Sequence, residues 1–160
     1  MDQLHGCPTG ESRGQATVFP SADQYLALVK KLVDDGYDMC SDVTAVDYLT
    51  HPGRSLPEGV EAQRFELVVN LLSLTNRTRL RVRVQVADGQ SVPSLFDLYP
   101  GTEAMEREVY DMYGIRFRNH PDLRRILMWK DFPAHPLRKD FPLRGRGERE
   151  HYQKLARDSA

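Results

Sequence analysis

Residues 64–86, RFELVVNLLSLTNRTRLRVRVQV, decide the fold because they hold the two clearest strand patterns in the chain. In residues 80–86 apolar side chains alternate with arginine or glutamine, which predicts a strand with one buried and one solvated face. Residues 64–74 are apolar on both faces, as expected of a central strand. The polar turn at 75–78 is short, so the two strands are predicted to form an antiparallel hairpin. The arginine row is interpreted as a solvated face, with a partner-binding stripe as the alternative.

A helix is predicted on the N-terminal side of the hairpin, over residues 22–35. Ser21 and Gln24 fit a capping box, in which each side chain bonds to the other residue's backbone amide. Apolar residues then recur at helical spacing until Gly36, which supplies a stop. Alternation over residues 42–48 predicts a further strand before the hairpin.

Two more helices are predicted on the C-terminal side of the hairpin. Ser94 is expected to cap a short helix through Tyr99, and Thr102 a second helix through Tyr113. Gly114 supplies the stop of the second helix. Together these elements predict an α+β fold, in which helices pack on a small mixed or antiparallel sheet.

Three segments differ in composition. Residues 1–16 are polar and are expected to be a disordered lead-in, and residues 17–115 form the predicted α+β domain. Residues 116–160, called the strap below, are proline-rich and are expected to be extended. Residues 1–115 hold 10 Lys/Arg and 17 Asp/Glu, whereas residues 116–150 hold 10 Lys/Arg and 5 Asp/Glu. This asymmetry predicts that the basic strap lies across an acidic or polar partner.

Several classes of site are not expected on this chain. No apolar run approaches the about 20 residues of a membrane span, so any membrane contact would go through a partner. Cys7 and Cys40 are far apart, and no histidine pair has helical metal-site spacing, which argues against zinc or an iron–sulfur cluster. Neither a glycine-rich phosphate loop nor a serine nucleophile elbow occurs. Aspartates interrupt the cations of the strap, so nucleic acid is not the expected partner.

Three carboxylates, Glu106, Glu108 and Asp111, fall within two turns of the predicted second helix. General acid–base chemistry would need two of them to face one cleft, but Glu106 and Glu108 point in different directions. Two other interpretations remain. The carboxylates form ion pairs on the flanks of the helix, or they bind the strap or arginines of a neighbouring protein.

The C-terminal half resembles a known family. The run EREVYDMYGI at 106–115, followed by Phe117, HPDLRRIL at 120–127 and HPLRKDFP at 135–142, resembles the C subunit of NADH–quinone oxidoreductase, respiratory complex I. The block at 106–127 and the block at 135–142 occur in the family's order and are separated by a segment of suitable length. Ala134 departs from the family, where a glycine is often found, and the chain is similar to the free-standing form of this family.

The resemblance implies a non-catalytic structural core subunit in the peripheral arm of a proton-translocating NADH:quinone oxidoreductase. No catalytic residue and no cofactor is expected on this chain. FMN, the iron–sulfur clusters and quinone would lie on partner subunits, and the implied partners are subunits D, B and I. The implied location is the cytoplasmic side of a bacterial cell membrane, with membrane contact only through the complex.

The residues expected at the partner interface combine acids, cations and one aromatic anchor. They are Glu106, Glu108, Asp111, His120, Arg124, Arg125, His135, Arg138, Lys139, Asp140 and Phe141. One alternative is the equivalent subunit of a membrane-bound hydrogenase or of a ferredoxin-linked complex. A more distant alternative is a stand-alone basic binding module.

Overall fold

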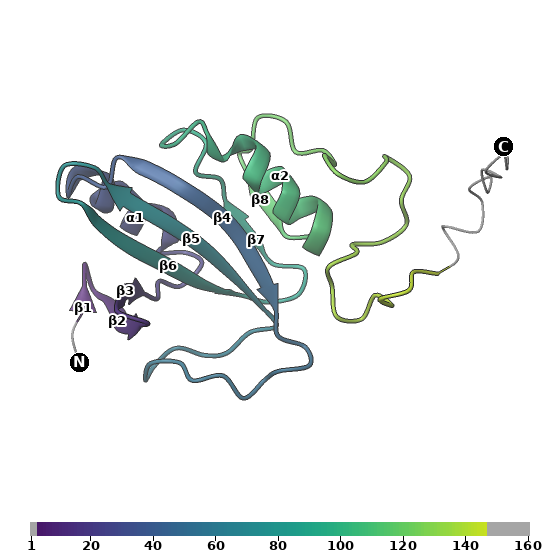
Figure 1. Cartoon of the computed structure of the whole chain (residues 1–160), viewed down its shortest axis with the longest axis horizontal. Coiled ribbons are helices and arrows are strands. Elements are labelled where there is room, and N and C mark those ends of the chain that lie inside the picture. The colour runs from purple at the N-terminus through teal and green to yellow at the C-terminus, as the bar shows by residue number, and fades with distance from the viewer. Residues whose placement is uncertain (1–2, 147–160) are drawn as a thin grey trace, which may run out of the picture.

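A six-stranded sheet with the order β1-β2-β3-β6-β5-β4 forms the centre of the computed structural model, which describes residues 3–146 (Figure 1). A second sheet pairs β7 with β8 in parallel. The elements are β1 Gln3–Leu4, β2 Cys7–Ser12, β3 Gln15–Val18, α1 Tyr25–Asp34, β4 Met39–Asp47, β5 Phe65–Ser73, β6 Thr78–Val86, β7 Ser91–Pro93, α2 Thr102–Tyr113 and β8 Arg116–Arg118. The predicted α+β fold with a mixed sheet is confirmed.

The hairpin of β5 and β6 is confirmed, and its pairing runs from Phe65 opposite Val86 to Ser73 opposite Thr78. β4 pairs with the other edge of β5, so β5 is an interior strand, as predicted. Apolar residues of β4, β5 and β6 form one core with the buried faces of both helices. α2 packs along β4, which protects this edge of the sheet (Figure 1).

The opposite face of the sheet is less solvated than predicted. Arg83 makes two bonds to the buried carboxylate of Glu66, Nε to Oε1 at 2.7 Å and Nη2 to Oε2 at 3.0 Å. Arg81 donates to the amide oxygens of Asn70 and Gln15. Only Arg79 of the arginine row is exposed, so the solvated-face interpretation is wrong for the other two arginines.

The prediction of a disordered lead-in over residues 1–16 is wrong for the described part of that segment. Leu4 pairs with Cys7, and Ser12 pairs with Gln15, so each of two hairpins is closed by a two-residue loop. Both loops, His5-Gly6 and Arg13-Gly14, have positive φ at both positions, which is the backbone that tight hairpins require. β3 then joins β6 in parallel, an association that no local pattern reveals.

The helices differ from the predictions mainly at their N-termini. The capping box of Ser21 and Gln24 forms, with both bonds at 3.2 Å, but α1 begins at Tyr25 rather than at 22. The short helix predicted from Ser94 to Tyr99 is a turn. α2 ends at Tyr113 as predicted but already includes Thr102, the predicted N-cap, whose hydroxyl donates to the Tyr99 carbonyl instead of capping the helix. Within residues 3–146, neither helix is long and apolar enough to cross a membrane.

Two buried tyrosines of the core differ in how their hydroxyl groups are satisfied. Tyr25 is fully buried, and its hydroxyl has no hydrogen-bond partner within the described part of the chain. The hydroxyl of Tyr99 donates to the carbonyl oxygen of Tyr37 at 2.6 Å. A buried polar group without a partner costs free energy, whereas a paired one does not.

We therefore expect opposite results from the same chemical change at the two positions. Tyr25→Phe should leave the free energy of unfolding unchanged or raise it by up to about 1 kcal/mol, and Tyr99→Phe should lower it by about 1 kcal/mol. Urea denaturation of the purified chains measures both values. A larger loss in Tyr25→Phe than in Tyr99→Phe would contradict this account of the core.

Candidate interaction site

Residues 116–146, the described part of the strap, fold back across α2 and the edge of the sheet, and the centre of this contact is the buried carboxylate of Asp111. Its Oδ2 accepts the backbone N–H groups of Ile126, Leu127 and Met128 at 3.0, 2.8 and 2.8 Å. Its Oδ1 accepts Nη1 of Arg125 at 2.7 Å. Burial alone would raise the pKa of Asp111, but these four donors hold it below its usual value.

Two arginines fix the path of the strap by donating to its backbone carbonyls. Arg125, besides binding Asp111, donates Nη2 to the carbonyls of Phe132 and Ala134 at 2.9 and 3.0 Å. Arg107 on α2 donates to the carbonyls of residues 124 and 125 at 3.1 and 3.2 Å. The planar guanidinium group can serve several acceptors at once, which a lysine cannot do in this geometry.

Residues 135–138 of the strap supply hydrogen-bond donors to the C-terminal end of α2. The last carbonyls of a helix lack partners inside the helix. Here Nδ1 of His135 donates to the Asp111 carbonyl at 2.9 Å, and the amide of Leu137 donates to the Met112 carbonyl at 3.1 Å. Arg138 reaches the Tyr113 carbonyl at 3.4 Å, and its positive charge also favours this end of the helix.

Gly114 makes this closure possible. Its φ of 81° is the left-handed conformation that commonly follows a helix. A Cβ at this position would lie 2.8 Å from the ring of His135, which is closer than side-chain atoms can approach. Two independent constraints, backbone conformation and space, therefore require glycine here.

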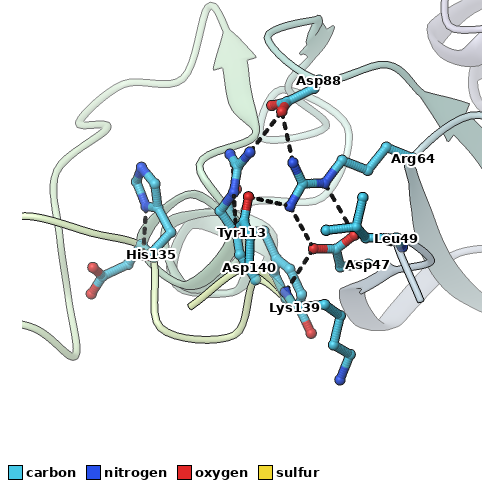
Figure 2. Close-up of polar contacts among 10 residues, drawn as sticks. Asp47, Leu49, Arg64, Asp88, Tyr113, His135, Lys139 and Asp140 are labelled. Carbon is cyan, nitrogen blue, oxygen red and sulfur yellow. Dashed lines mark hydrogen bonds and ion pairs between the residues drawn. The ribbon is translucent and has the colours of Figure 1, made fainter. Parts of the chain in front are cut away.

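Arg64 joins the strap to the sheet in a network of two arginines and three aspartates (Figure 2). Arg64 binds Asp47 at 2.9 Å, Asp88 at 2.9 Å and Asp140 at 2.8 Å. Arg138 binds Asp88 at 2.7 Å and lies 3.5 Å from Asp140. Residues at the ends of β4 and β6 are thereby tied to the strap.

Asp47 is the buried member of this network. It also accepts the backbone amide of Lys139 at 2.8 Å, so the strap contributes a donor to it directly. Burial would raise the pKa of Asp47, but the bonds from Arg64 and from the amides of Lys139 and Leu49 lower it. Asp47 was not among the residues predicted at the interface, although its alternation with Val43 and Ala45 on β4 is a signal that could have indicated a buried acid.

Glu106 forms a separate buried cluster nearer the start of α2. Its carboxylate accepts the Ser94 hydroxyl at 2.5 Å and the Leu95 amide at 2.7 Å. The amide of Asp122 donates to Nδ1 of His120, so the proton of His120 lies on Nε2, which donates to the Glu103 carbonyl at 3.0 Å. Burial raises the pKa of Glu106.

The residues predicted at the interface therefore have different surroundings. Asp111, Arg125, His135, Arg138 and Asp140 are brought together, and their polar groups bind within the chain. The Lys139 side chain is exposed, although its amide binds Asp47. The side chains of Glu106 and His120 are buried, whereas Glu108 is exposed and has no polar partner within residues 3–146. Arg124 pairs with Asp122 at 2.7 Å on the surface, and Phe141 packs against Phe132.

The solvent-exposed side chains of the strap, called its outward face below, are mainly apolar or cationic, with Asp122 and Asp131 among them as exposed acids. Its exposed apolar side chains are Ile126, Leu127, Trp129, Leu137 and Leu143. Lys130, Lys139 and Arg144 are also exposed and form no ion pair in the described part of the chain. This surface suits protein binding better than catalysis. No group of three or more potential metal ligands occurs in residues 3–146, and residues 147–160 of the predicted strap lie outside the described residues.

Comparisons with known proteins agree on one family. Residues 18–147 match the model of the family "Respiratory-chain NADH dehydrogenase, 30 Kd subunit". The C subunit of NADH-quinone oxidoreductase from Geobacter sulfurreducens is 42% identical over 145 residues, which cover 89% of this chain and 83% of that protein. The corresponding protein of Bordetella petrii is 43% identical over 146 residues, covering 84% of this chain and 70% of that protein.

Solved structures show the same fold. A trypsin-resistant fragment of Nqo5 is 31% identical, with a TM-score of 0.65, and the match covers 74% of this chain and 91% of the fragment. A chain of an archaeal membrane-bound sulfane sulfur reductase is 22% identical, with a TM-score of 0.73, over 96% of this chain and 87% of that chain. At that identity the second likeness concerns the fold alone.

The closure of α2 gives a prediction for Gly114→Ala. The added methyl group meets both a left-handed backbone and the His135 ring, so we expect the free energy of unfolding to fall by about 2 kcal/mol. Gly53→Ala is the matched control, since its Cβ would meet nothing within 4 Å. Urea denaturation compares the two variants, and equal stability would contradict the proposed packing.

The two buried acids should have opposite pH dependence. The folded-state pKa of Asp111 is lowered, so its contribution is present above about pH 4 and is lost as the pH falls through that pKa. The pKa of Glu106 is raised, so its contribution is complete below about pH 4 and is lost as the pH rises through that pKa.

At pH 7 we therefore expect Asp111→Asn to cost about 3 kcal/mol, because it also leaves Arg125 unpaired. Glu106→Gln should cost less than about 1 kcal/mol at pH 7, with its disadvantage growing as the pH falls toward 4. Thermal unfolding between pH 3 and 8 measures both effects, with the exposed Asp131→Asn as the neutral control. Parallel pH profiles for the two variants would refute these assignments.

Proposed function

The chain belongs to the family of the 30 Kd subunit of respiratory-chain NADH dehydrogenase, and from this premise we propose that it is a non-catalytic structural core subunit of complex I. In this role it supports electron transfer from NADH to quinone in the peripheral arm of a proton-translocating enzyme. FMN, the iron–sulfur clusters and quinone would be bound by its partners. The relatives named as the C subunit of NADH-quinone oxidoreductase support this proposal.

The observation that carries the proposal is the division of the strap into two faces. Asp140, Arg125 and Arg138 of the strap bind the body of the same chain. Its exposed apolar side chains and lysines have no such contacts in the described part of the chain. We propose that this outward face binds subunits D, B and I, with Trp129 as an aromatic anchor and the cations meeting acidic groups of the partners.

The proposed location is the cytoplasmic side of a bacterial cell membrane, reached only through the other subunits. An equivalent role in a hydrogenase or a ferredoxin-linked complex would use the same fold, as the likeness to the sulfane sulfur reductase chain illustrates. Identities of 41–45% to relatives named as part of NADH-quinone oxidoreductase favour the NADH-dependent enzyme. A stand-alone binding module would leave Trp129 and Leu127 permanently exposed, which is unfavourable for a monomer.

The proposal predicts that the outward face is required for assembly but not for folding. The double variant Leu127→Asp/Trp129→Ala should reduce co-purification with other subunits, and membrane NADH:quinone activity, by at least about tenfold, since it removes a central apolar contact. Leu49→Asp is the control, because Leu49 is 48% exposed, like Trp129, but does not belong to the strap.

The measurement is affinity purification of the tagged full chain from gently solubilised membranes, with each variant first shown to unfold at the wild-type temperature. Recovery of an iron–sulfur assembly that oxidises NADH supports the proposal. An assembly inactive with NADH would instead favour another electron donor. Wild-type assembly in the double variant would exclude this face as the interface.

A further inference from the structure

Four arginines lie at the end of the sheet away from the strap. Arg13 lies in the β2–β3 turn, Arg77 in the β5–β6 turn, and Arg79 and Arg81 on β6. β3 runs parallel to β6 with Ala16 opposite Leu80, so the β2–β3 turn lies beside the beginning of β6. The β5–β6 turn and residues 119–146 of the strap lie on opposite sides of the sheet in Figure 1.

None of these four arginines forms an ion pair with a carboxylate within residues 3–146. Arg13, Arg77 and Arg79 are exposed. Arg81 is held by two neutral groups, Oδ1 of Asn70 at 3.0 Å and Oε1 of Gln15 at 2.9 Å. These amides fix the guanidinium group but leave its charge uncompensated, in a part of the chain that is otherwise acidic.

The surroundings of these arginines are more typical of a binding surface than of a solvent-exposed end of a sheet. Arg79 and Arg81 line a polar hollow of about 270 Å³ together with Gln15, Ser41, Asp42 and Asn70. Leu74 in the turn is 60% exposed, and Met39, on the neighbouring end of β4, is 44% exposed. Exposed apolar side chains beside oriented, unpaired guanidinium groups are typical of protein interfaces.

We infer that this arginine end, defined by Arg13, Arg77, Arg79, Arg81, Met39 and Leu74, binds the acidic surface of a second protein in the same assembly. A guanidinium group held in place by amides suits the planar geometry of a carboxylate. Asp42 in the hollow and Asp38, which accepts the Leu74 amide, interrupt the positive charge, and such a mixed pattern suits a protein surface better than a uniformly anionic lipid surface. The chain would then bind partner subunits at both ends of the sheet, which extends the proposed function.

The test places a photo-crosslinking amino acid at Leu74 of the full chain in cells, followed by purification of the assembly. We expect a crosslink to another subunit at a segment that contains Asp or Glu. Arg77→Glu/Arg79→Glu should lower the crosslink yield about tenfold, because it places like charges across the interface. Lys30→Glu/Lys31→Glu, the same charge change at exposed positions of α1, should alter it by less than about twofold.

Exchange of the mapped partner acids for lysine should restore the yield with Arg77→Glu/Arg79→Glu, and this rescue is the strongest support. Crosslinks to lipid alone, an unchanged yield in the double variant, or no crosslink in a recovered assembly would each overturn the inference. This inference rests on the proposed function, so a chain that purifies without any assembly would refute both, whereas a recovered assembly without a crosslink at Leu74 would refute this inference alone.

Discussion

The carboxylate of Asp111 is completely buried, and a buried carboxylate is tolerated only when donors surround it. The body of the domain does not provide these donors. Three come from consecutive backbone amides of the strap and one from Arg125, so the charge of Asp111 is compatible with the fold only when the strap is in place. Asp47 depends on the strap in part, because the Lys139 amide adds to the donors that Arg64 and Leu49 supply from the body. Burial of two acids thus couples an irregular segment to the sheet and to α2.

The C-terminal end of α2 couples the strap to the domain in the same way, with the carbonyl groups of the helix as the acceptors. The last carbonyl groups of a helix have no hydrogen-bond partners within the helix. His135, Leu137 and Arg138 supply donors to three successive carbonyls, and Gly114 turns the chain away without a side chain that would block the His135 ring. The backbone amides of residues 126–128 therefore donate to Asp111, and residues 135–138 donate to the end of α2. These two sets of bonds fix both the position and the register of the strap.

Patterns of local origin were predicted well, and associations of distant segments were not. The alternation in residues 80–86 predicted β6 and its hairpin, and Gly114 predicted the end of α2. The N-terminal strands were missed because they are short and are stabilised by a parallel pairing with β6, although the His5-Gly6 and Arg13-Gly14 pairs were usable turn signals. In the strap, the residue types of the contact were recognised, but not that their partners, Asp47, Asp88 and Arg64, lie in the same chain.

The charge asymmetry of the sequence takes on a different meaning in the structure. A basic strap after an acidic body suggested an external acidic partner, yet Arg125 and Arg138 bind acids and carbonyls within the chain itself. Those contacts need the fixed, planar donors of arginine. The cations left outside include Lys130 and Lys139, whose hydrated charges favour encounter with an acidic surface more than they add affinity. In the proposed interface, specific binding would come mainly from the apolar side chains beside them, so the strap would use arginine to hold its shape and apolar surface to select its partner.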